Sequence, residues 1–140
     1  MKNFKFGNSS LKRLQTCHHD LQKLMHLTLE RTEEDFTILQ GVRTKEEQDK
    51  FYKEGKSKVK FPNSKHNIVP SMAVDIAPYP IDWNDIARFH KLAKVVLNCA
   101  EELNLTVRWG GDWDMDGDTS DQTFNDLPHF ELCWKKYSDS

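Results

Sequence analysis

Hydrophobic residues recur every three to four positions in two stretches of the chain, residues 10–31 and 84–104. This spacing gathers them on one face of a helix, so it predicts two amphipathic helices. Residues 45–54 are charged and helix-prone, and they favour a third helix. The two apolar stripes consist of Leu11, Leu14, Leu21, Leu24, Met25 and Leu27 in the first stretch and of Ile86, Phe89, Leu92, Val95, Val96, Cys99 and Leu103 in the second.

Four shorter apolar segments predict β-strands. The first lies within residues 35–44 and ends at Gly41, and the others are at residues 73–79, 105–110 and 129–134. Helices alternate with strands along the chain, but one long loop and a closing strand break the alternation. The order therefore predicts an α+β fold, a small single domain with a mostly antiparallel sheet flanked by helices.

The chain has 140 residues and a formal net charge of -2. This length suits one domain, residues 1–140, with a single core and no appended binding module. The charge offers no basic surface to nucleic acid or to an anionic membrane. No apolar run approaches ~18 residues, so no membrane insertion is expected. A compact chain without an obvious exposed apolar stripe is expected to be a monomer.

Three cysteines, Cys17, Cys99 and Cys133, stand at wide spacings without a CxxC pair. This pattern disfavours a disulfide framework or a cysteine zinc site, and free thiols fit a reducing cytosol. The first residues contain no apolar core of a signal peptide, so synthesis in the cytoplasm is expected. Action outside the cytosol would then require a separate release step.

Three side chains of the types that bind zinc occur in two short segments far apart in sequence. His66 and Asp75 lie in SKHNIVPSMAVDIAP, and His129 lies in DLPHFEL with Asp126 three residues before it. A catalytic zinc takes three protein ligands and an open position for water, and hydrolysis needs a base near that water. Taken singly, each residue is more often a solvated histidine or a structural carboxylate. Together they predict a zinc hydrolase, with Asp126 as the base or as a carboxylate that orients a ligand histidine.

The same two segments resemble the M15 family of zinc peptidases, the group of the D-Ala-D-Ala carboxypeptidases and L-Ala-D-Glu endopeptidases. FKFGNSSLKRL, FTILQGVRT, IDWNDI and RWGGDWD also follow the family's pattern in the expected order, so the resemblance covers nearly the whole chain. It implies that His66, Asp75 and His129 bind Zn2+ and that Asp126 is the catalytic carboxylate. It also implies that Arg43 of QGVRT holds a substrate carboxylate.

Within this group the chain looks like the single-domain phage endolysins, which cut the L-Ala–D-Glu bond of peptidoglycan stem peptides. That likeness implies no separate cell-wall-binding domain, synthesis in the host cytoplasm and action on the wall after release. A D-Ala-D-Ala carboxypeptidase of the same fold is the near alternative. A non-catalytic zinc-stabilised binding domain and a structural role with calcium and no zinc are the more distant ones.

The spacing of the first two ligands departs from the family. Eight residues separate His66 from Asp75, two more than the family commonly has, and an insertion around residues 68–71 at the rim of the site accounts for them. Arg43 has the planar fork that suits the free α-carboxylate of D-Glu, and this role is favoured over the alternative of a surface arginine near a turn. Ser64 is expected to position a ligand or the substrate, or else to cap the turn.

Three further residues lie close to these motifs. Glu131 is two residues past His129, so it shares a strand face with it and can orient it. Trp109 and Trp113 are expected either to line the cleft or to belong to the core.

An acidic loop at residues 112–121 is a second candidate metal site. Its first half fits the D-x-D-x-D-G pattern of an EF-hand calcium loop, whereas the twelfth position is Thr123 in place of the bidentate glutamate. The loop therefore predicts either a non-standard, regulatory Ca2+ site or a solvated acidic loop. Its carboxylates are Asp112, Asp114, Asp116 and Asp118.

Overall fold

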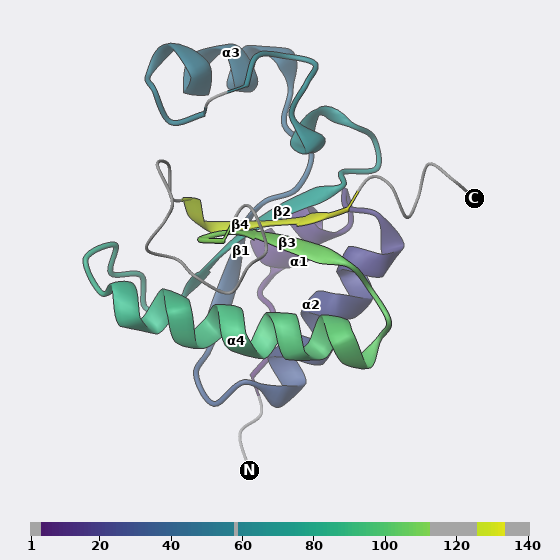
Figure 1. Ribbon diagram of the computed structural model, residues 1–140, viewed down its shortest axis with the longest axis vertical. Coiled ribbons are helices and arrows are strands. Elements are labelled where there is room, and N and C mark those ends of the chain that lie inside the picture. Colours follow the sequence, from purple (N-terminus) through teal and green to yellow (C-terminus); the bar gives the residue numbers. More distant parts are fainter. Residues whose placement is uncertain (1–3, 58, 113–125, 134–140) are drawn as a thin grey trace.

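The computed structural model describes residues 4–57, 59–112 and 126–133. The elements follow the order expected for an α+β chain (Figure 1). They are α1 (Asn8–Leu14), α2 (His19–Arg31), β1 (Phe36–Gln40), α3 (Lys45–Lys53), the 3-10 turn η1 (Lys65–Asn67), β2 (Ala73–Pro78), α4 (Ile86–Glu102), β3 (Val107–Gly110) and β4 (Asp126–Leu132).

The four strands form one sheet in the order β1-β2-β4-β3, and every neighbouring pair is antiparallel. The prediction of an antiparallel sheet is confirmed. Strand β4 follows all the other described elements in the chain, yet it lies between β2 and β3. Its pairing with β2 places His129 directly opposite Asp75. The middle of the sheet therefore joins two segments that are far apart in sequence.

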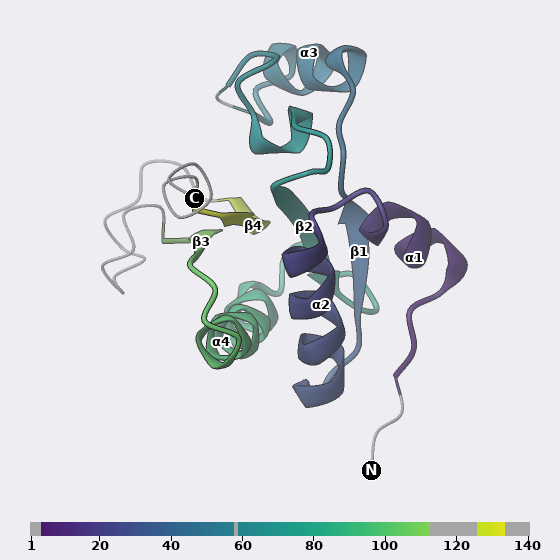
Figure 2. The same ribbon diagram turned by 90° about the vertical axis from the view of Figure 1, so that its right-hand side faces the viewer.

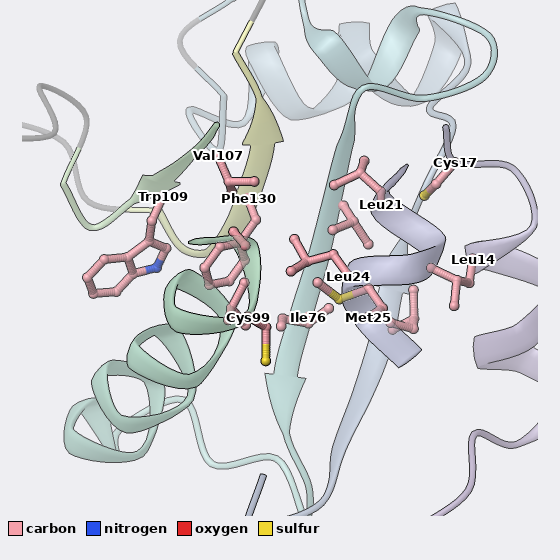
Figure 3. Packing of buried hydrophobic residues seen from close by; sticks show 14 of the residues in the cluster. Leu14, Cys17, Leu21, Leu24, Met25, Ile76, Cys99, Val107, Trp109 and Phe130 are labelled. Carbon is pink, nitrogen blue, oxygen red and sulfur yellow. The ribbon is translucent and has the colours of Figure 1, made fainter. Parts of the chain in front are cut away.

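Helices α2 and α4 lie side by side on one face of the sheet, and α3 stands beyond the other face (Figure 1 and Figure 2). Because successive strand residues point to opposite faces, β2 and β4 send alternate side chains toward the two helices. Figure 3 shows Ile76 and Phe130 between the side chains of α2 and α4, where both are almost fully buried. The strand residues that alternate with them, such as Asp75 in β2 and His129 in β4, face the side of α3, where the candidate site lies.

The helix expected at residues 10–31 is in fact two helices, α1 and α2, separated by residues 15–18. The apolar stripe is helical on both sides of this gap, so periodicity did not reveal the break. The backbone of the gap pairs with Ser71 instead: Ser71 N–H donates to Thr16 O, and His18 N–H donates to Ser71 O. A tertiary contact has therefore replaced helical hydrogen bonds.

Two strand boundaries also differ from the prediction. Strand β1 ends at Gln40, one residue before the expected end at Gly41, and β4 begins at Asp126 rather than at His129. Thr44 caps the start of α3 in a capping box. Its hydroxyl accepts the Glu47 N–H, and the Glu47 carboxylate accepts the Thr44 N–H. Among the described residues, no helix is both long and apolar enough to cross a membrane.

Gly41 packs where a side chain does not fit, so Gly41→Ala is expected to lower the free energy of unfolding by about 2–3 kcal/mol. An added Cβ would collide with the Thr16 hydroxyl and the Arg13 carbonyl oxygen. Urea denaturation in the presence of a chelator measures this loss. Gly7→Ala is the control, because a Cβ there meets nothing within 4 Å, and it should cost less than about 1 kcal/mol. Equal losses in the two variants would contradict the close packing at Gly41.

Candidate metal centre and catalytic cleft

Three potential ligand atoms converge on the sheet face opposite the core. His66 Nε2 lies 3.1 Å from Asp75 Oδ1 and 3.2 Å from His129 Nδ1. His129 Nδ1 lies 3.2 Å from the same Asp75 oxygen. Asp75 and His129 are cross-strand partners, whereas His66 comes from η1. The structure thus brings together the three residues that the sequence indicated as ligands.

A hydrogen bond to an acceptor holds the outer nitrogen of each histidine. His66 Nδ1 lies 2.8 Å from Gly41 O, and His129 Nε2 lies 2.8 Å from Glu131 Oε1. A carbonyl oxygen and a carboxylate only accept, so both outer nitrogens donate. In the neutral imidazoles this leaves the lone pairs on His66 Nε2 and His129 Nδ1, beside the Asp75 oxygen. Histidines that bind metals commonly have their second nitrogen fixed in this way.

The spacing of the three atoms suits a tetrahedral metal ion. Electron-rich atoms this close repel one another unless a positive charge lies among them. Zinc binds imidazole nitrogen and carboxylate oxygen at about 2.0–2.2 Å, which in a tetrahedron separates two ligands by roughly 3.3–3.6 Å. The observed separations are 3.1–3.2 Å. Three protein ligands also leave a fourth position for water or substrate, as catalytic sites require.

The same convergence shifts the pKa values of the ligands. Burial raises the pKa of Asp75, but the charges and hydrogen bonds of His66 and His129 outweigh burial and hold this pKa well below its usual range. Burial also disfavours protonated His129, yet hydrogen bonds to Asp75 and Glu131 raise the pKa of this histidine to about 9. A proton on His129 is therefore the alternative to a metal ion as the positive charge, so proton and metal compete.

Glu131 is the buried carboxylate that fixes His129. Its second oxygen, Oε2, lies 3.0 Å from Lys65 Nζ and accepts a hydrogen bond from Arg108 Nη2 at 2.7 Å. Burial alone would raise the pKa of Glu131, but the hydrogen bond with His129 and the two cations lower it to about 2. Glu131 is therefore ionised, and it acts on the metal site through His129. The sequence had indicated this position for Glu131 but not its two cationic partners.

Arg43 holds Asp75, much as Glu131 holds His129. Its Nη2 donates to Asp75 Oδ2 at 3.2 Å, its Nε to Gln40 Oε1 at 2.9 Å and its Nη1 to Gln48 Oε1 at 3.0 Å. The side chain is 8% exposed and its guanidinium lies 4.4 Å from the centre of the Phe51 ring. The interpretation as an ordinary surface arginine is therefore wrong. Sequence reasoning missed Gln40 and Gln48, because nothing in their local pattern marks them as partners of a buried cation.

Asp126 reaches the same face through an irregularity in the strand. Asp126 and His129 are three residues apart, so a regular strand would point them to opposite faces. The pairing with β3 shifts register here, since Trp109 pairs with Phe130 but Gly110 pairs with Asp126. Such bulges re-aim side chains near active sites. Burial, and then the negative charge of Asp75, raise the pKa of Asp126 to about 6.

A cleft of about 860 Å³ contains the three candidate ligands together with Arg43, Asp126 and Glu131. All four strands contribute lining residues, and α3 and the segment that leads to η1 supply one side of the cleft. This volume suits a small peptide, and the mixture of apolar and charged lining is typical of ligand sites. The sequence-indicated residues in the lining are Arg43, Ser64, His66, Asp75, Asp126, His129 and Glu131.

Other sequence-indicated residues lie at the edge of the cleft or outside it. Ser64 caps η1, because its hydroxyl accepts the His66 N–H at 3.2 Å, and it also lines the cleft. Residues 68–71 do not line the cleft, so the expected effect of an insertion on the rim is not seen. Trp109 is buried against Phe130 in the core. Of the two expectations for this tryptophan, the core position is the correct one.

Most of the candidate calcium loop lies outside the described residues, as does Trp113. Asp114, Asp116 and Asp118 belong to this part of the chain. Asp112 is described, and its N–H donates to Trp109 O at 3.0 Å directly after β3. Calcium binding there stays a prediction.

The chain belongs to the family of phage L-alanyl-D-glutamate peptidases, whose model matches residues 2–133. It is 40% identical over 123 residues to the L-alanyl-D-glutamate peptidase of Escherichia phage T5. The aligned region covers 85% of this chain and 88% of that relative. The resemblance drawn from the sequence motifs is therefore confirmed.

The fold is also that of a solved enzyme, the Serratia marcescens L-Ala D-Glu endopeptidase ChiX. The two structures agree with a TM-score of 0.79 at 27% sequence identity. The match covers 97% of this chain and 95% of ChiX. The expected α+β fold of a peptidase is thereby confirmed.

Glu131→Gln is expected to weaken metal binding by about 10- to 100-fold, because the neutral side chain holds the His129 N–H less firmly. Titration with zinc ions against a chelating indicator measures the affinity. Glu102→Gln is a matched control, since Glu102 pairs with Arg31 at 2.8 Å on the surface. Unchanged affinity in the Glu131 variant would show that this carboxylate does not support the ligand.

Proposed function

We propose that the protein is a zinc-dependent endopeptidase that cleaves the L-Ala–D-Glu bond of peptidoglycan stem peptides. The observation that carries the proposal is the convergence of two imidazole lone pairs and one carboxylate oxygen at 3.1–3.2 Å in a peptide-sized cleft. Membership of the phage L-alanyl-D-glutamate peptidases supports the substrate and the bond. It also supports a role as an endolysin that lyses the host cell wall.

Zinc is the metal that best suits the donor set. Two neutral imidazoles and one carboxylate bind borderline metals, and three protein ligands are usual for a catalytic zinc. Zinc bound by His66, Asp75 and His129 would polarise the scissile carbonyl and make a bound water more acidic. The nitrogen atoms that bind it are His66 Nε2 and His129 Nδ1, because Gly41 and Glu131 hold the other two.

Asp126 is the proposed proton carrier. Its carboxylate lines the cleft with the three ligands, and its raised pKa makes it a better proton acceptor than an ordinary aspartate. In hydrolysis it takes a proton from the attacking water and delivers it to the nitrogen of the leaving D-Glu. Glu131 already holds His129, and this weakens the alternative in which Asp126 orients that histidine.

Arg43 and Ser64 are proposed to contact the substrate beside the metal. A guanidinium has five N–H groups, and three of those in Arg43 are donated to Gln40, Gln48 and Asp75. Both Nη atoms therefore keep one hydrogen for a substrate oxygen. The Ser64 hydroxyl accepts from His66 N–H and retains its own hydrogen for donation. These donors suit the negative charge that develops on the scissile carbonyl oxygen.

A D-Ala-D-Ala carboxypeptidase of the same fold is the alternative activity. The names of the phage T5 relative and of ChiX both specify the L-Ala–D-Glu bond, so the comparisons favour the endopeptidase. A non-catalytic binding domain would have no use for a proton carrier beside the ligands.

Asp126→Asn is expected to lower kcat by about 100- to 10,000-fold, since the amide cannot take the proton from water. Mass spectrometry of products from purified peptidoglycan, incubated with zinc-loaded protein, measures cleavage and identifies the bond. The zinc affinity of the Asp126→Asn variant is measured in parallel and should differ little from that of the wild type.

The control is Asp85→Asn, a change of the same type at the start of α4. The wild-type protein is expected to release fragments that end at L-Ala, which the Asp126 variant does not. Loss of only terminal D-Ala would favour the carboxypeptidase. No cleavage by a zinc-loaded wild type would contradict the peptidase, and full activity in the Asp126 variant would contradict its role.

The raised pKa of Asp126 predicts an acid limb in the pH profile. The carboxylate accepts the proton, so kcat/KM falls about tenfold for each pH unit below its pKa. A cation held nearby lowers that pKa, so the limb lies at or below about 6. Rates on a soluble stem peptide at saturating zinc, with circular dichroism to show that the fold persists, measure the limb. A midpoint well above pH 6 would assign it to another group.

A further inference from the structure

We infer that the exposed surface of Trp83 binds the N-acetylmuramic acid ring of peptidoglycan, so that the enzyme cleaves stem peptides joined to this sugar faster than free ones. The inference rests on the proposed function, because Trp83 lines the same cleft. It concerns recognition of the glycan, whereas Asp126, Arg43 and Ser64 are proposed to act on the peptide.

Trp83 is a large aromatic side chain that remains exposed in the cleft. It belongs to the segment between β2 and α4, lines the cleft and is 56% exposed. Its ring is stacked on that of Phe89 in α4, with 5.6 Å between the ring centroids and 18° between the ring planes. Phe89 is almost fully buried, so this contact holds the indole in one orientation. An indole that is stacked on one face and still more than half exposed presents a flat apolar surface to the cleft.

Trp83 lies toward the end of the cleft where β2 ends and β4 begins. Strand β2 passes the candidate metal centre at Asp75, which pairs with His129, and it ends at Pro78, five residues before Trp83. Figure 1 shows the segment between β2 and α4 at the left, at the same end of the sheet as the start of β4. Asp126 is the first residue of β4, so the proposed proton carrier and the indole belong to the same end of the cleft.

The other end of the cleft, where β2 begins, is charged. Glu131 is the cross-strand partner of Ala73, the first residue of β2. Lys65 Nζ lies 3.0 Å from Glu131 Oε2, and both residues line the cleft. The candidate metal centre therefore lies between an aromatic end and a charged end. Two ends of such different character suit a substrate that differs in the same way on the two sides of the scissile bond.

Peptidoglycan is such a substrate. The amino group of L-Ala is joined to the lactyl group of N-acetylmuramic acid, so one amino acid separates the scissile carbonyl from the sugar. On the other side of the bond, D-Glu carries a free α-carboxylate. A sugar that close to the metal has to lie in the cleft or at its rim. The face of a pyranose ring presents C–H groups, which pack favourably against the negative face of an aromatic ring.

Phe51 is the other phenyl or indole ring among the described residues that line the cleft, and it is less suited to a sugar. The guanidinium carbon of Arg43 lies 4.4 Å from the centre of the Phe51 ring, and Lys56 Nζ lies 5.8 Å from it. Both distances allow cation–π attraction. The Phe51 ring therefore already has cationic partners, whereas the described ring contact of Trp83 is with an apolar ring.

The experiment compares two synthetic substrates with the same stem peptide. In one, N-acetylmuramic acid acylates the L-Ala nitrogen through its lactyl group, and in the other a lactyl group without the sugar does so. For the zinc-loaded wild type, kcat/KM is expected to be about 5- to 20-fold higher for the glycopeptide, the range for covering one aromatic face. Trp83→Ala should remove most of this preference by slowing cleavage of the glycopeptide. Trp83→Tyr should retain part of it, because tyrosine again offers a flat ring.

Tyr79→Ala is the matched control. Tyr79 lies in the same segment and is 57% exposed, but it lines a separate hollow together with residues 5–10. It should keep the wild-type preference. Circular dichroism and urea unfolding of each variant show whether the fold persists.

Four results would overturn the inference. A wild type that cleaves both substrates equally would show that the sugar is not bound, although the peptidase itself would stand. A Trp83→Ala variant that keeps the full preference would assign the sugar to another residue. Equal losses on both substrates in that variant would mean that Trp83 only shapes the cleft. A wild type that cleaves neither substrate would remove the proposed function and this inference with it.

Discussion

The antiparallel pairing of β2 with β4 is the constraint on which the rest of the site depends. It sets Asp75 opposite His129, and the same ladder sends Val74 and Phe130 into the core. A shift of this pairing by one residue would exchange the two faces, burying the ligands and exposing the core. The hydrophobic effect therefore fixes the register, and the register fixes the positions of two of the three candidate ligands.

Hydrogen bonds from neighbouring groups orient the candidate ligands. Gly41 and Glu131 determine which histidine nitrogens carry lone pairs, and Arg43 holds the second oxygen of Asp75. Positive and negative groups alternate outward from the centre, from the proposed metal through the carboxylates to Arg43 and Arg108. Asp75 and Glu131 each have a cationic or N–H partner, and this offsets the cost of burying their charge.

The sequence allowed the antiparallel sheet, the helix α4 and the three residues that meet in the candidate metal centre to be predicted, because local motifs and periodicity carry them. Three features depended on contacts distant in sequence. The break at residues 15–18 follows from pairing with Ser71, and the burial of Arg43 follows from Gln40 and Gln48. The turn of Asp126 onto the catalytic face follows from a register shift against β3. Periodicity describes neighbours along the chain, so none of these could be read from it.

The position of β4 has a consequence for how the protein is made. Strands β2 and β3 are not neighbours in the sheet, and residues 126–132 must fill the place between them. A growing chain on the ribosome cannot close this sheet until that segment has emerged. The same segment carries Asp126 and His129. Partly synthesised chains and products truncated before β4 therefore have no complete site, so hydrolytic capacity arises only when the last described strand is in place.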